Sequence, residues 1–172
     1  MSISHAHDNQ RILNNIDVAI SGKKTANSIT VTIGTPTGTV AGLQTGNDGT
    51  YFHLQEASGA PGMNLIVDFI SVTNFSIVNI IANYSGTTTH AVACQLYNWN
   101  TTAWDTFNAM QTHVNDLTTA SGKILDNYDF FIPNTTNYIG TSGDAGKVRV
   151  RFYHTMSGST GHSVDIDVVA LY

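Results

Sequence analysis

Short segments in which apolar and polar side chains alternate are the feature that most constrains the fold of this chain. The first, residues 28–33 (SITVTI), places apolar β-branched side chains on one face of an extended backbone and polar side chains on the other. Seven more segments have this pattern or a nearly continuous apolar one, at residues 51–55, 64–72, 75–86, 89–99, 128–133, 147–154 and 163–172. Turn sequences such as NDG at 47–49 separate them. About eight short antiparallel strands joined by turns predict an all-β fold, in which two sheets pack together or one closes.

Composition sets the size of the protein and excludes several classes of partner. The chain has 172 residues, the length of a single domain, and 11% of them are charged, against about 25% in typical globular proteins. The net charge is −5, and the 7 Lys and Arg residues form no cluster larger than the pair at 23–24, so we expect no nucleic-acid partner. No stretch approaches the ~18 consecutive apolar residues of a membrane span, and the N-terminus has no signal-peptide core. We therefore expect no membrane partner and synthesis in the cytoplasm without an export signal.

The first 27 residues differ in pattern from the rest and are expected to form an N-terminal arm, with a single sandwich domain at 28–172. Ile12, Ile16 and Ile20 are spaced by four, which would place one apolar stripe on a helix. A disordered tail is the alternative, and both interpretations stay open. Because the segment has too little apolar surface to fold alone, we expect it to act as an assembly arm that docks on a shell or a neighbouring subunit.

The last two segments carry the clearest prediction of a buried face. We expect six of their side chains to lie in the core: Val148, Val150, Phe152, Val164, Ile166 and Val168. On the opposite face, Arg149 and Arg151 alternate in the same way as Asp165 and Asp167. We interpret these four residues as surface ion pairs rather than as a catalytic acid pair. The single cysteine, Cys94, excludes an intrachain disulfide and is expected to act as a small core side chain.

The sequence contains no nucleophile elbow, phosphate-binding loop or zinc-protease motif, so we expect no enzymatic activity and no catalytic residues. Among the 7 histidines, His5 and His7 form a close pair at the terminus, but no cysteine or carboxylate cluster completes a zinc site there. The remaining ones are interpreted as scattered, ordinary histidines: His53, His90, His113, His154 and His162. We therefore expect no metal and no cofactor. A structural calcium ion held by Asp48, Glu56 and Asp167 stays open, although no loop motif supports it.

An aromatic group in residues 94–107 (CQLYNWNTTAWDTF) is the candidate binding feature. In an extended strand Tyr97 and Trp99 share one face, and Trp104 follows a short connection, so all three rings lie near one strand end. Exposed rings at a loop end would form a stacking platform for a ligand. The alternative is structural, with Trp104 folded over the sandwich edge as a plug. We favour the plug for Trp104, whereas both interpretations stay open for Tyr97 and Trp99.

Four stretches together resemble jelly-roll β-sandwich modules of tailed-phage virion proteins: NDGTYFHLQEA (47–57), LYNWNTTAWDTF (96–107), NYIGTSG (137–143) and residues 147–172. They are also similar to the wider group of galactose-binding-like jelly rolls. The resemblance covers about residues 40–172. It implies a jelly-roll β-sandwich whose last two strands lie in facing sheets rather than in one hairpin.

The same resemblance implies two functions. In virion proteins it implies a capsid decoration (cement) protein that binds the major capsid protein or another virion protein by surface complementarity, as a homo-oligomer, with a trimer favoured. In the carbohydrate-binding relatives it implies sugar contact through aromatic side chains, carried here by Tyr97, Trp99 and Trp104. We therefore expect a non-enzymatic structural protein of the virion, with a glycan-binding module of a phage tail or fibre as the alternative.

Overall fold

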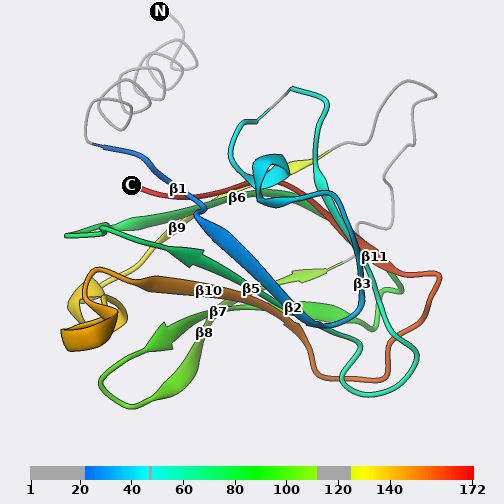
Figure 1. The fold of residues 1–172 in the computed structure, drawn as a ribbon. Coiled ribbons are helices and arrows are strands. Elements are labelled where there is room, and N and C mark those ends of the chain that lie inside the picture. The colour runs from blue at the N-terminus through cyan, green and yellow to red at the C-terminus, as the bar shows by residue number, and fades with distance from the viewer. Residues whose placement is uncertain (1–21, 47, 112–124) are drawn as a thin grey trace, which may run out of the picture.

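The protein is an antiparallel β-sandwich of the jelly-roll class, as the sequence predicts (Figure 1). The computed structural model describes residues 22–46, 48–111 and 125–172. The predicted arm residues Ile12, Ile16 and Ile20 lie outside these ranges, as do three histidines: His5, His7 and His113. None of the helices in the described ranges is long and apolar enough to cross a membrane.

Two sheets form the layers of the sandwich, and all their strand pairs are antiparallel. Sheet A has the order β3-β4-β11-β6-β9, with β1 also paired to β11. Its strands are β1 (Lys24–Thr25), β3 (Thr35–Thr37), β4 (Phe52–Gln55), β6 (Ile77–Ser85), β9 (Asp126–Phe131) and β11 (Ser163–Leu171). Sheet B has the order β2-β5-β10-β7-β8. Its strands are β2 (Ser28–Ile33), β5 (Met63–Phe69), β7 (Ala91–Asn98), β8 (Ala103–Gln111) and β10 (Val148–His154). Three 3-10 helices lie in the connections: η1 (Val40–Leu43), η2 (Thr135–Tyr138) and η3 (Ser142–Asp144).

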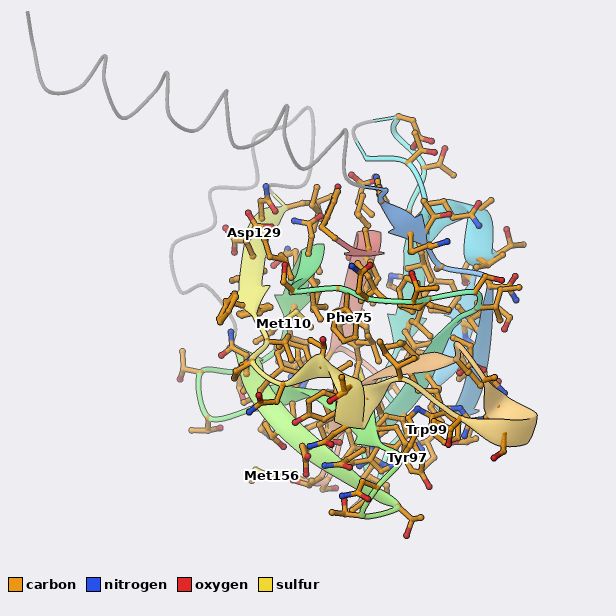
Figure 2. All side chains as sticks on the ribbon, turned by 90° about the vertical axis from the view of Figure 1, so that its left-hand side faces the viewer. Phe75, Tyr97, Trp99, Met110, Asp129 and Met156 are labelled. Carbon is orange, nitrogen blue, oxygen red and sulfur yellow. The ribbon has the colours of Figure 1, made fainter. Side chains whose placement is uncertain are left out.

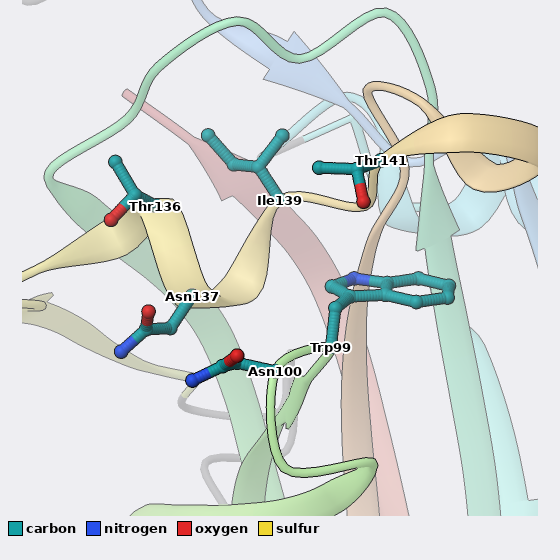
Figure 3. Close-up of a pocket in the computed structure, with 6 residues that line it drawn as sticks. All are labelled: Trp99, Asn100, Thr136, Asn137, Ile139 and Thr141. Atoms are coloured by element: carbon teal, nitrogen blue, oxygen red, sulfur yellow. The ribbon is translucent and has the colours of Figure 1, made fainter.

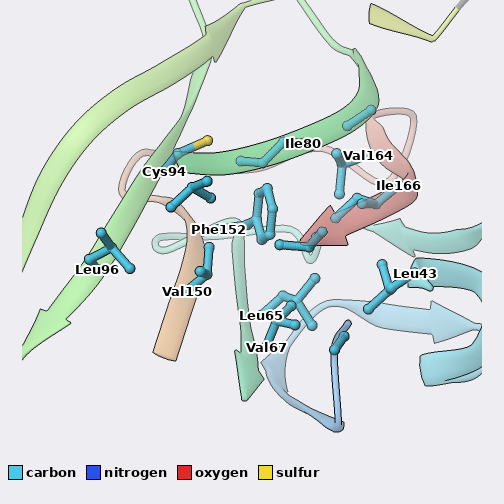
Figure 4. Close-up of a cluster of buried hydrophobic side chains, with 14 of the residues drawn as sticks. Leu43, Leu65, Val67, Ile80, Cys94, Leu96, Val150, Phe152, Val164 and Ile166 are labelled. Carbon is cyan, nitrogen blue, oxygen red and sulfur yellow. The ribbon is translucent and has the colours of Figure 1, made fainter. Parts of the chain in front are cut away.

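The hydrophobic core fills the space between the two sheets (Figure 4). All six side chains predicted to be buried in the last two strands are buried, and Cys94 is buried with them. The prediction that these strands lie in facing sheets is also confirmed, since β10 belongs to sheet B and β11 to sheet A. Val168 is buried but does not belong to the main core cluster. The register of β11 shifts between Ile166 and Val168, so Val169 and Leu171 continue the core face while Val168 lies outside the main cluster.

Three strands were missing from the sequence prediction. The sequence predicts no strand at β8, because its residues (AWDTFNAMQ) alternate less clearly than those of an inner strand. β3 has only three residues, too few for a periodic pattern. β1 lies inside the segment assigned to the arm, where Lys24 and Thr25 pair with Leu171 and Ala170. Ala26 is buried, so the sandwich begins before residue 28.

The predicted ion pairs between the last two strands are wrong. Arg149 donates from Nε to Asp68 on the neighbouring strand β5, at 3.1 Å. Asp165 and Asp167 are instead buried on β11, at 1% and 2% exposure, and Asp165 lies 2.8 Å from Nδ1 of His53. The reason is topological: arginines facing outward from sheet B cannot reach the acids of the other sheet.

Candidate functional site

The outer face of sheet B gathers aromatic and charged side chains from neighbouring strands. Burial alternates along β5, β7 and β10, so every second residue of these strands points away from the core. The outward residues of β10 are Arg149, Arg151 and Tyr153, each partly exposed. We call the following set the aromatic–arginine face: Tyr97, Trp99, Trp104, Arg149, Arg151 and Tyr153.

Strand register aligns these side chains in rows across the sheet. Tyr97 of β7 lies opposite Trp104 of β8. Arg151 of β10 lies between Gln95 of β7 and Ile66 of β5. Residues opposite each other in an antiparallel pair have side chains close enough to touch. The alternation along each strand and the register between strands therefore bring side chains of the aromatic–arginine face into contact across the sheet.

The three aromatic residues proposed from the sequence do come together. The ring centroids of Tyr97 and Trp99 are 4.9 Å apart at an interplanar angle of 83°, and those of Tyr97 and Trp104 are 5.2 Å apart at 68°. Both are edge-to-face contacts, a favoured geometry for aromatic pairs. Figure 2 shows Tyr97 and Trp99 side by side at one end of the molecule. Trp104 is not a plug over the sandwich edge, because its ring lies on the open face of the sheet.

Two arginines lie between these rings. The guanidinium carbon of Arg151 is 4.3 Å from the ring centroids of both Trp104 and Tyr153. That of Arg149 is 5.2 Å from the Trp99 ring and 5.8 Å from the Tyr97 ring. These distances are within the range of cation–π attraction. Each arginine thus contacts two aromatic rings of the face.

Arg151 differs from Arg149 in its charge balance. The Nε of Arg149 donates to a carboxylate, whereas the Nε of Arg151 donates to the neutral Oε1 of Gln95, at 2.7 Å. Burial lowers the pKa of Arg151 from its ordinary value, which indicates a partly dry environment. A guanidinium group stays protonated in proteins even so. Within the described ranges, the side-chain contacts of Arg151 are with Gln95, Trp104 and Tyr153, and none of these groups is acidic enough to neutralise its charge.

Sequence reasoning missed the contribution of β10 to this face. The signal was present, because the alternation in residues 147–154 puts both arginines and Tyr153 on one side of a strand. What the pattern did not reveal is that β10 lies between β5 and β7, next to the strand that carries Tyr97.

The turn between β7 and β8 is held by a network of hydrogen bonds. Oδ1 of Asn98 accepts from two backbone N–H groups of the turn, at 3.0 and 3.1 Å. Oδ2 of Asp105 accepts from Nδ2 of Asn98 and from the hydroxyl of Tyr138, at 2.8 and 3.1 Å. The backbone N–H of Trp99 donates to the carbonyl of Asn137 at 2.9 Å. The end of the aromatic–arginine face is therefore tied to the segment that contains η2.

A hollow of about 290 Å³ lies at this junction (Figure 3). Its walls are mostly hydroxyl and amide side chains with one indole: Trp99, Asn100, Thr136, Asn137, Ile139 and Thr141. The indole N–H of Trp99 is buried and has no hydrogen-bond partner within the described part of the chain. The hollow extends the outer face of sheet B with polar groups.

A second cluster lies at one end of the sandwich, between the sheets. The interpretation of the histidines as scattered is wrong for His90, His154 and His162, because all three converge on Glu56. In the described ranges, Asp48, Glu56 and Asp167 form no group able to hold calcium, and the group that does form is Glu56 with His90 and His154. No sequence motif marks these residues.

Comparisons with known proteins give weak structural likenesses alone. No family model matches the chain, and no curated protein matches it. A solved variant of the family 29 carbohydrate-binding module CBM29-2 is similar with a TM-score of 0.47 and 11% identity, over 85% of this chain and 92% of that one. The module TmCBM61, solved with β-1,4-galactotriose, has a TM-score of 0.44 and 8% identity, over 88% of each chain. The family 32 module of C. perfringens NanJ, solved with galactose, has a TM-score of 0.44 and 15% identity, over 86% of this chain and 98% of that one.

Proposed function

We propose that this protein is a non-enzymatic glycan-binding module and that the sugar binds on the aromatic–arginine face. The observation that carries the proposal is the packing of four partly exposed aromatic rings and two arginines on one open sheet face. Such a face has no role in the core of the sandwich, which lies on the other side of sheet B. Large amphipathic side chains gathered on a surface are typical of recognition sites.

The chemistry of the face matches that of a sugar ring. A pyranose presents apolar C–H groups on its faces and hydroxyl groups around its edge. The rings of Tyr97, Trp99 and Trp104 offer apolar contact to the former. Arg149 with Asp68, and Arg151 with Gln95, are adjacent donors and acceptors for neighbouring hydroxyls. Because these groups are already ordered by each other, little side-chain entropy is lost on binding.

The charge of Arg151 favours a glycan that carries an acidic group. Its guanidinium lies between the rings of Trp104 and Tyr153 and donates to a neutral amide rather than to a carboxylate. A carboxylate or sulfate of the ligand would form a charge-assisted hydrogen bond with it. The hollow beside Trp99 would then hold the next sugar unit, whose hydroxyls meet Thr and Asn side chains.

A virion location and docking on a capsid or other virion protein form the second candidate function. The observation that favours it is the composition of the same face, because Trp, Tyr and Arg are the residues most enriched at the energetic centres of protein interfaces. This candidate uses the same residues and predicts binding to purified particles that free oligosaccharides do not displace. The trimeric state stays a prediction that light scattering would test.

The experiment is a glycan array that includes neutral, uronic-acid and sulfated oligosaccharides, followed by calorimetry on the strongest ligand. We expect Trp104→Ala and Arg151→Ala each to weaken binding by about tenfold or more, which corresponds to ~1.4 kcal/mol. The matched control is Phe131→Ala, which removes a ring that is 74% exposed on β9 of sheet A. Equal affinity in all three variants would contradict the proposal, as would the absence of any ligand on the array.

A further inference from the structure

Glu56, His90, His154 and His162 come from four different segments and meet at one end of the sandwich. Glu56 directly follows β4 and His162 directly precedes β11, both in sheet A. His154 is the last residue of β10 and His90 directly precedes β7, both in sheet B. The four side chains therefore link the two layers of the fold where their strands end.

The potential ligand atoms of these residues are close together. One ring nitrogen from each of His90 and His154 and one carboxylate oxygen of Glu56 all lie within 4.8 Å of one another. Nδ1 of His154 is 2.7 Å from Oε1 of Glu56, and Nδ1 of His162 is 3.3 Å from Oε2. The ring of His90 has its centroid 4.7 Å from that of His154 and 5.0 Å from that of His162.

Burial makes this cluster unusual. His154 is fully buried and Glu56 is 1% exposed. The carboxylate accepts hydrogen bonds from the hydroxyl of Tyr84 at 2.8 Å and from the backbone N–H of Ser159 at 2.9 Å. Burial, followed by that contact with Glu56, raises the pKa of the Tyr84 hydroxyl well above its ordinary value. An acidic group held this way needs a positive charge nearby to offset its desolvation.

The imidazole nitrogens do not provide ordinary hydrogen bonds to it. Both ring nitrogens of His154 are buried without a hydrogen-bond partner in the described part of the protein, and so are Nδ1 of His90 and Nδ1 of His162. Nδ1 of His154 is only 2.7 Å from the carboxylate, but the oxygen does not lie in the direction that an N–H group requires. Two ligand atoms that face a common point instead of each other produce this geometry.

We propose that Glu56, His90, His154 and His162 bind a divalent transition-metal ion, with zinc as the expected ion. Imidazole nitrogen and one carboxylate are ligands that zinc prefers, whereas calcium prefers a shell of oxygens. Zinc–nitrogen bonds of about 2.0–2.1 Å in a tetrahedron separate neighbouring ligand atoms by about 3.3 Å. Nδ1 of His162 and Oε2 of Glu56 are already at this spacing. Nδ1 of His154 and Oε1 of Glu56 are closer, at 2.7 Å, and the ligand atoms of Glu56, His90 and His154 all lie within 4.8 Å of one another, so the observed distances bracket this value. The ion also gives the buried carboxylate its positive partner.

Tyr84 and two neighbouring loops pack closely around the cluster. Tyr84 would orient the ligating carboxylate, in the way that hydrogen-bond partners of metal ligands commonly do. A Cβ added at Gly62 would lie 2.7 Å from Nδ1 of His154 and 2.7 Å from Cα of Gly158. The backbone of these two loops approaches as closely as glycine allows. Because the ligands are enclosed, the ion would act as a structural clamp between the sheets rather than as a catalytic centre.

The test uses the full chain with His5 and His7 both changed to Ala, which removes the other close histidine pair as a source of background binding. We expect one zinc ion per chain by elemental analysis after dialysis, a higher melting temperature with zinc, and a lower one after chelation. Cobalt in place of zinc should give the visible absorption of a tetrahedral centre.

Substitutions of the proposed ligands distinguish a specific zinc site from adventitious zinc binding. His90→Ala and His162→Ala, at positions that are not fully buried, should lower zinc affinity by at least about 10–100-fold, the loss typical of removing a mere hydrogen-bond partner of a ligand, and Glu56→Gln should do the same. His53→Ala is the matched control, because that histidine pairs with Asp165 elsewhere on sheet A. A folded parent protein that binds no zinc would overturn the proposal. Zinc affinity that is unchanged in both His90→Ala and His162→Ala would also overturn it.

Discussion

At the scale of single residues, Phe152 shows how the inward half of β10 stabilises the sandwich. Its side chain is fully buried and lies in the middle of the cluster between the sheets (Figure 4). We expect Phe152→Ala to lower the free energy of unfolding by about 3–5 kcal/mol, because the neighbouring side chains relax only partly into the space left behind. Urea denaturation measures this change. A loss below about 1 kcal/mol would mean that the core does not depend on this ring.

Cys94 lies on the neighbouring strand, and burial raises the pKa of its thiol to about 12, from an ordinary value of 9.0. The folded protein therefore keeps the thiol neutral at a pH at which the unfolded chain already forms a thiolate. Stability from this group is complete below about pH 9 and is lost as the pH rises from there toward 12, at up to about 1.4 kcal/mol per pH unit. We expect urea midpoints to fall above pH 9, and to fall less steeply in Cys94→Ala. Equal slopes in the two proteins between pH 9 and 10.5 would contradict this assignment.

At the scale of structural elements, two loops must approach closely for the histidine cluster to form. Gly59 and Gly158 form an isolated antiparallel bridge, and a Cβ at Gly62 would be in contact with Gly158 and His154. We expect Gly62→Ala to lower the free energy of unfolding by about 1–3 kcal/mol. Gly143→Ala is the control, because a Cβ there meets nothing within 4 Å. Thermal unfolding of both variants tests the prediction, and similar melting temperatures for the two would contradict it.

The start of the sandwich at β1 changes how the predicted assembly arm must be tested. Removing residues 1–27 also removes the pairing of Lys24–Thr25 with β11 and the buried Ala26. We expect that truncation to cost about 1–3 kcal/mol of stability relative to removal of residues 1–21 alone. The shorter truncation is the one to compare with the full chain by light scattering, because a change in mass then reports on the arm. Equal stability of the two truncated proteins would show that β1 contributes little.

Sequence patterns revealed the strands with a strong period of two and left the contacts between distant segments unresolved. The inward face of β10 was predicted correctly because alternation within one strand decides it. The partners of Arg149 and Arg151 were not, since they depend on which strands lie beside β10. No pattern within a single segment predicts the histidine cluster. Its members lie in four segments that extend along the chain from Glu56 to His162, and each looks ordinary in its own segment.

At the scale of the whole molecule, the two faces of β10 serve different purposes. Side chains that point inward build the core and end at His154 in the buried cluster, while those that point outward form the aromatic–arginine face. The chain as a whole carries a net charge of −5, yet this face presents two arginines next to one another on the same strand. Because Arg149 is paired with Asp68, the unmatched charge is that of Arg151, and in the proposed complex it would attract an acidic group of the glycan.

The most direct test of glycan binding on sheet B uses the two tryptophans, which are the only ones in the chain and both belong to the aromatic–arginine face. Each indole N–H gives one cross-peak in a nitrogen–proton correlation spectrum, so two peaks report on the site. On titration with the strongest array ligand, we expect both indole peaks to shift and to saturate at the affinity measured by calorimetry. Saturable binding that leaves both indole peaks in place, with shifts confined to sheet A, would contradict it.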